Sequence, residues 1–156
     1  MAGLNAEYIN PFLIAATKIL KDMCFLDAKV GKPYIKEAAF EQDTLVIMIG
    51  VTGEIRGQVM ISFSNVVACD IASKMIMMPI TQMDELSKSA ISELGNMIMG
   101  NTATIFSSKG IGIDITPPTI VTGSMTISTS LTKNICIPLA YEEGKAIEIN
   151  VSLKGE

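Results

Sequence analysis

The sequence contains no histidine among its 156 residues. Hydrolases that rely on a Ser-His-Asp triad, enzymes with a histidine general base and zinc sites with an imidazole ligand are therefore excluded. This one absence removes more function classes than any other feature of the composition.

Charged residues are also scarce. They make up 18% of the chain, against a usual share of about 25%, and the net charge is −4. Nucleic acids and acidic membrane surfaces are bound through clustered Lys and Arg, and the sequence has no such cluster. Neither partner is expected. Because 49% of the residues are apolar, the composition favours an oligomer that buries additional surface.

Long apolar runs are missing as well. The longest, Leu45 to Val51, falls far short of the roughly 18 residues that a membrane-spanning helix needs, and no secretion signal is visible. The cysteines, Cys24, Cys69 and Cys136, are odd in number, lack C-x-x-C spacing and have apolar neighbours. These features indicate free thiols in a reducing compartment, so we expect a cytoplasmic protein without a bound metal.

The length suits one compact domain, predicted to span residues 1–156. Apolar spacing predicts a first helix over 10–25, with Asn10 as N-cap and Pro11 in the first turn. A second helix is predicted from the cap Ser64 to about Met77, and a third from about Asp84 to Ser107. Strands are predicted at 30–35, 44–51, 56–63, 124–128, 134–141 and 146–153, with hairpin turns at 53–54 and 142–145.

This order of elements, in which runs of strands are separated by helices, indicates an α+β fold. The two halves also look like weak repeats. When Glu7-Tyr8-Ile9-Asn10 is placed over Glu93-Leu94-Gly95-Asn96, Ile19 falls on Ile105 and Leu20 on Phe106.

The segment from Ser87 to Phe106 predicts an unusual helix. Its apolar face carries Ala90, Leu94, Ile98 and Ile105, and its opposite face carries Ser89, Ser92, Glu93, Asn96 and Gly100. Glu93 and Asn96 are three positions apart, so their side chains are neighbours. Gly95 and Gly100 each cost about 1 kcal/mol of helix stability relative to alanine. Small side chains on one face permit close approach by a neighbouring helix or a docking partner.

The pattern E-x-x-N alone is a weak signal, which two polar surface residues would also produce. The wider segment Ser89-Ala90-Ile91-Ser92-Glu93-Leu94-Gly95-Asn96-Met97-Ile98-Met99-Gly100-Asn101 resembles the active helix of the CheC/CheX/FliY phosphatases. The opening Asn10-Pro11-Phe12, the length and the order of elements resemble the CheX members. The resemblance implies a CheC-like fold, in which two pseudo-repeated halves form one mixed sheet with long helices packed on it.

The resemblance also implies an activity. These enzymes hydrolyse the aspartyl phosphate of CheY-like response regulators in chemotaxis signalling, and the regulator supplies the Mg²⁺, so this chain needs no cofactor. Asn96 would orient the attacking water, and Glu93 would pair with the regulator's lysine. The residues expected to contact the partner are Ser89, Ser92, Met99 and Gly100.

The family's two-site members carry the motif in both halves. Here Asn10 precedes Pro11, and a residue before proline is pushed out of the α region. Glu7 and Asn10 are therefore not expected to share a helical face, and one active site per chain is predicted. The resemblance further implies a homodimer joined through sheet strands.

Two other functions remain open at this stage. One is a non-catalytic module, related by fold to flagellar switch proteins, that binds a regulator without hydrolysis. The other is a dimeric scaffold in which the small-residue face packs against a helix, and burial of Asn96 against its own chain would support it. The sequence does not specify which regulator is the substrate.

Overall fold

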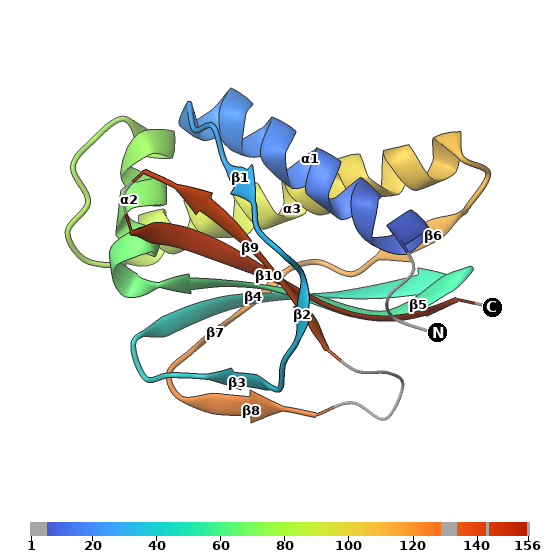
Figure 1. Cartoon of the computed structure of the whole chain (residues 1–156). Coiled ribbons are helices and arrows are strands. Elements are labelled where there is room, and N and C mark those ends of the chain that lie inside the picture. The colour runs from blue at the N-terminus through green and yellow to red at the C-terminus, as the bar shows by residue number, and fades with distance from the viewer. Residues whose placement is uncertain (1–5, 129–133, 143, 156) are drawn as a thin grey trace.

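The computed structural model describes residues 6–128, 134–142 and 144–155. Within them the helices are α1 (Ala6–Cys24), α2 (Asn65–Ile76) and α3 (Glu85–Ser108). Figure 1 shows α1 and α3 side by side across one face of a large sheet, with α2 at one end of that sheet.

The strands are β1 (Lys29–Val30), β2 (Tyr34–Ile35), β3 (Ala38–Phe40), β4 (Thr44–Gly53), β5 (Ile55–Ser64), β6 (Ile113–Ile115), β7 (Thr119–Thr122), β8 (Met125–Ile127), β9 (Ile135–Tyr141) and β10 (Lys145–Gly155). The large sheet has the order β1-β9-β10-β5-β4-β6, with β2 also pairing with β9 and β7 with β4. Strands β3 and β8 form a separate pair. The α+β class is confirmed, but the pairings described are all antiparallel rather than mixed.

The two halves have the same architecture. Each begins with a long helix and continues through five strands, and α2 connects them. Strands β1 and β2, which follow α1, pair with β9 of the second half, and β6 and β7, which follow α3, pair with β4 of the first. Corresponding bonds recur: the amide of Gly31 donates to the carbonyl of Pro138 at 2.8 Å, and that of Thr116 to the carbonyl of Gly50 at 3.0 Å. The repeat predicted from the sequence is confirmed at this level.

The starts of α2 and α3 are confirmed by their caps. The hydroxyl of Ser64 accepts the amide of Val67 at 3.2 Å. The carboxylate of Asp84 accepts the amide of Ser87 at 2.9 Å, and the Ser87 hydroxyl accepts the amide of Asp84 at 2.7 Å. This reciprocal pair is a capping box, which fixes where the first turn of α3 begins.

The start of α1 was predicted wrongly. The helix includes Glu7 and Asn10, so Asn10 is not its N-cap and both side chains are exposed on one helix. Pro11 lies inside the helix. Ile9 and Phe12, which flank the Asn10-Pro11 pair, are buried in the core. Their packing outweighs the local preference against helical conformation in the residue before proline. The capping argument for a single active site therefore fails, and the number of sites stays a prediction.

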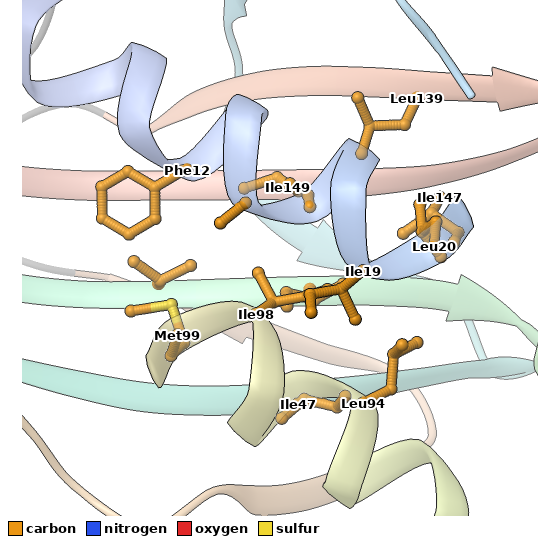
Figure 2. Close-up of a cluster of buried hydrophobic side chains, with 14 of the residues drawn as sticks. Phe12, Ile19, Leu20, Ile47, Leu94, Ile98, Met99, Leu139, Ile147 and Ile149 are labelled. Atoms are coloured by element: carbon orange, nitrogen blue, oxygen red, sulfur yellow. The ribbon is translucent and has the colours of Figure 1, made fainter. Parts of the chain in front are cut away.

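The main core lies between the helices and the sheet. Figure 2 shows Ile19 of α1 next to Ile98 of α3, Phe12 of α1 on the same side as Met99 of α3, and Leu20 of α1 beside Ile147 of β10. The rings of Phe12 and Phe106 stack edge to face with their centroids 5.7 Å apart, which joins the two helices.

A second, smaller cluster covers the opposite face of the sheet. It lies beneath the β3·β8 pair and contains Ala38, Phe40, Val46 and Met60. Because β4 and β5 carry buried side chains on both faces, β4 reads in sequence as the nearly continuous apolar run that predicted a buried strand.

Candidate functional site

Helix α3 presents one polar face to solvent. Ser89, Glu93, Asn96 and Gly100 are exposed and Ser92 is half-buried. The buried face carries Ser87, Ile91, Leu94, Gly95, Ile98, Met99, Thr102 and Phe106. The polar residues lie on the exposed face of the helix, as predicted. The buried face, however, also includes Gly95 and Met99, which the sequence did not place there.

Glu93 and Asn96 lie one helical turn apart, and neither side chain makes a hydrogen bond or ion pair with another residue in the described part of the chain. Both are therefore available to a partner. Burial of Asn96 against its own chain would have supported the scaffold alternative. Asn96 is exposed, so the structure gives that alternative no support.

Gly95 brings this helix close to the sheet. A Cβ atom added at Gly95 would lie 3.0 Å from Cδ1 and 3.1 Å from Cγ2 of Ile47, a fully buried residue of β4. The close approach that the small residues predicted is thus made by a strand of the same chain at Gly95. A Cβ atom at Gly100 would meet nothing within 4 Å, so that part of the polar face stays open.

A second segment faces the helix across a groove. Pro117 and Pro118, between β6 and β7, lie opposite Glu93 and Asn96, together with Ile120. Two bonds fix this segment on β4: the amide of Thr116 donates to the carbonyl of Gly50 at 3.0 Å, and the Gly50 amide donates to the Thr116 hydroxyl at 2.8 Å. Helix α3 and the proline segment are therefore both held in place by contacts with β4.

The resulting groove has a volume of about 700 Å³ and is open to solvent. Its lining residues are Glu85, Lys88, Ser89, Ser92, Glu93, Asn96, Pro117, Pro118 and Ile120. The structure thus gathers Ser89 and Ser92 of the predicted partner-contact residues around Glu93 and Asn96. Gly100 is exposed one turn beyond Asn96 but does not line the groove.

Met99 does not belong to this surface. Its side chain is fully buried in the main core, as Figure 2 shows, so the prediction that it contacts a partner is wrong. Close packing of α3 on β4 at Gly95 turns this position inward. A flexible apolar side chain at the edge of a helix face fills such irregular space well.

Sequence reasoning missed Glu85, Lys88 and the proline segment. Helical periodicity offered a signal for the first two, because Glu85 and Ser89 are four positions apart and Lys88 and Ser92 likewise. Nothing local could have placed Pro117 and Pro118 beside α3. Their position depends on pairing with β4, about 70 residues away in the sequence.

The remaining charged cluster lies at the end of the sheet near α2. Asp70 lies 3.0 Å from the Lys74 ammonium and 3.5 Å from that of Lys145, and it accepts the Tyr141 hydroxyl at 2.9 Å. Burial opposes the ionisation of Asp70. The bonds from Lys74 and Tyr141 and the two nearby cations together outweigh it, so the pKa of Asp70 lies below its ordinary value. This cluster joins α2 to the β9–β10 hairpin.

No group of three or more Cys, Asp or Glu residues within the described ranges is placed to hold a metal ion. Burial raises the pKa of the Cys24 thiol to about 11, which keeps it protonated and unreactive. Among the helices described, none is long and apolar enough to cross a membrane.

Comparison with known proteins gives consistent results. Residues 45–140 match the family model described as chemotaxis phosphatase CheX. The CheY-P phosphatase CheX of Thermotoga maritima is 32% identical over 152 residues, which cover 97% of this chain and 98% of that protein.

Solved structures agree with this match. A CheC-like superfamily protein from Shewanella sp. PV-4 superposes with a TM-score of 0.87 at 28% identity, covering 97% of this chain and all of the other. A Borrelia burgdorferi CheX, solved as a complex with CheY, BeF₃ and Mg²⁺, superposes with a TM-score of 0.80 at 30% identity, covering 96% of this chain and 99% of the other. With a family model matched over more than half of its length and a relative similar from end to end, the chain belongs to the CheX family of chemotaxis phosphatases.

Proposed function

We propose that this chain hydrolyses the aspartyl phosphate of a CheY-like response regulator, with Glu93 and Asn96 as its catalytic residues. The observation that carries the proposal is the placement of these two side chains. They stand one turn apart on a well-anchored helix, in a groove open to a partner, without a bond to any described residue of their own chain. The names of its relatives, a CheY-P phosphatase and a protein crystallised with CheY, support the same activity.

Asn96 would act on the attacking water. Its amide can accept one hydrogen from the water and hold the oxygen in line with the phosphorus. As the water oxygen bonds to phosphorus, the bond from phosphorus to the aspartyl oxygen breaks, and inorganic phosphate and a free carboxylate are released. Rigid placement matters here, because a water held in a near-attack position needs little further ordering.

Glu93 would fix the position of the regulator. A carboxylate exposed beside Asn96 can form a charge-assisted hydrogen bond with a lysine next to the phosphorylated aspartate. Such a bond gives both affinity and register, and the register places Asn96 at the phosphoryl group. Ser89 and Ser92, in the same groove, would complete the contact.

The partner and the setting follow from the same proposal. Mg²⁺ would be held by the regulator rather than by this chain, in keeping with the complex formed by the Borrelia relative. We also propose a homodimer, a cytoplasmic location and a single domain over residues 1–156. Dimer formation is tested by sedimentation at several concentrations, and a purely monomeric species would contradict it.

The test of the activity is the decay of phosphorylated CheY from the same organism. Wild-type protein should accelerate the decay, and Asn96→Ala should reduce the acceleration by about 100-fold or more, because the water is no longer held in place. Asn101→Ala is the matched control, since Asn101 lies on the same helix but donates to the carbonyl of Met97 at 3.0 Å. It should retain the wild-type rate.

The outcomes separate the functions that remain. Loss of the acceleration in Asn96→Ala alone supports hydrolysis by this site. Binding that requires phosphorylation of the regulator, without any acceleration, would replace the phosphatase with the non-catalytic module. Equal losses in both variants would show that Asn96 has no special role.

A further inference from the structure

The groove is longer than the reaction requires. It extends along α3 from Asn96 back to Glu85, eleven residues or roughly 16 Å. A phosphoryl group held at Asn96 and a lysine at Glu93 occupy only one end. The other end, which carries Glu85 and Lys88 on α3, has no part in the chemistry proposed above.

Lys88 is the unusual residue at that end. It is half-buried in the groove, and among the described residues no carboxylate lies within ion-pairing distance of its ammonium group. By contrast, Lys36, Lys74 and Lys145, which are similarly buried, all form ion pairs. A partly desolvated cation without a partner in its own chain is suited to bind a carboxylate of another.

Lys88 is too far from Asn96 to act on the phosphoryl group. Eight residues of helix separate them, a rise of about 12 Å. Helical side chains also lean toward the N-terminus, which takes the ammonium group of Lys88 further away from Asn96. Its contribution therefore concerns docking rather than the reacting atoms.

The opposite wall is rigid and apolar. Pro117 and Pro118 have restricted backbones, and Thr116 and the β7 pairing hold them on β4. A surface that is already ordered loses little conformational entropy on binding. This wall, opposite Glu93 and Asn96, fits an apolar side chain of the regulator, while Lys88, two turns back along the facing helix, fits a carboxylate.

We infer that Lys88 forms a docking subsite that selects the regulator, apart from the catalytic pair. The subsite binds a carboxylate of the regulator at a distance from the phosphorylated aspartate, while the Pro117–Pro118 wall packs against the regulator nearer to that aspartate. The inference rests on the proposed function, because the same regulator must occupy both ends of the groove.

The experiment measures binding of the beryllofluoride-activated regulator, a stable mimic of its phosphorylated form, by fluorescence titration. Lys88→Glu should raise the Kd about tenfold, with an effect that shrinks at high salt, and kcat at saturating phosphorylated regulator should stay within about twofold of wild type. Lys109→Glu is the matched control, because it makes the same change in net charge at the exposed C-terminal end of the same helix. It should leave the Kd unchanged within about twofold.

Two results would overturn the subsite. One is an equal Kd for Lys88→Glu and Lys109→Glu, and the other is a fall in kcat with an unchanged Kd. These failures differ from failure of the proposed function. Binding that depends on Lys88 without accelerated decay would refute hydrolysis and keep the subsite, whereas a wild-type chain that binds none of a panel of regulators would refute both.

Discussion

At the scale of single residues, two asparagines on α3 show how surroundings decide availability. Asn101 donates to the carbonyl of Met97, so its amide is already engaged by its own helix. Asn96 makes no such bond and faces the groove. Residue type alone does not distinguish them. Their different positions around the helix do.

Asp70 is predicted to stabilise the fold through its charge. Replacing it in Asp70→Asn removes the ion pairs with Lys74 and Lys145, and we expect a loss of about 1–2 kcal/mol in the free energy of unfolding at pH 7. The folded pKa is lowered. The contribution of the charge is therefore complete above the unfolded pKa of about 3.9 and is lost as the pH falls through the folded pKa.

Urea unfolding of wild type and Asp70→Asn at pH 7 and at about pH 3 checks this prediction. The difference between the two proteins should shrink at the lower pH. A difference of the same size at both pH values would mean that the shape of the side chain, rather than its charge, stabilises the fold.

Much of the site was predictable residue by residue. Periodicity placed Glu93 and Asn96 on the polar face, and the structure keeps them exposed and adjacent. Periodicity failed for Met99, because it assigns a face from local spacing and ignores how closely the helix approaches the sheet. Gly95 looked like part of an open face in sequence, but it is the position where the helix touches Ile47.

At the scale of elements, that contact between α3 and β4 sets the width of the groove. In Gly95→Ala the new methyl group would press on Ile47, which is fully buried. Overpacking costs about 1–3 kcal/mol, and the better helix propensity of alanine returns about 1. We expect a net loss of about 1 kcal/mol in stability and slower phosphatase activity, since α3 moves relative to the proline segment.

Two further variants check this explanation. Ile47→Ala removes both close atoms and leaves Cβ at 3.7 Å, so Gly95→Ala combined with Ile47→Ala should lose less stability than the sum of the single changes, as measured by a double-mutant cycle. Simple additivity of Gly95→Ala and Ile47→Ala would contradict direct contact between these two positions.

Gly100→Ala tests the same helix without that contact. The new methyl group would meet nothing within 4 Å, so this variant should stabilise the protein by up to about 1 kcal/mol.

The elements themselves were predicted unevenly. Capped helices and long strands were found because caps, turns and apolar runs are local signals, as at Ser64 and Asp84. Strands β3, β6 and β7 were missed. They are three or four residues long, and their pairing partners lie far away in the sequence, so local patterns carry little information about them.

At the scale of the whole molecule, the halves complete each other. Each half supplies the edge strands beside the long strand of the other, and β5 pairs with β10 at the centre of the sheet. We therefore predict one cooperative unfolding transition for residues 1–156. In calorimetry the van't Hoff and calorimetric enthalpies of the monomer unit should agree within about 10%. Two separate transitions would contradict a single domain.

The reciprocal strand pairing also suggests how such a chain arises. A half-length ancestor with this architecture would leave its edge strands unpaired, and two copies could satisfy each other only as a closed pair. Duplication and fusion through a linker such as α2 would make that pair permanent. Once both copies are in one gene, a single working groove suffices, and the other copy is free to drift. Lys32 and Pro33 stand where the second half has Pro117 and Pro118, which is the kind of divergence that such freedom allows.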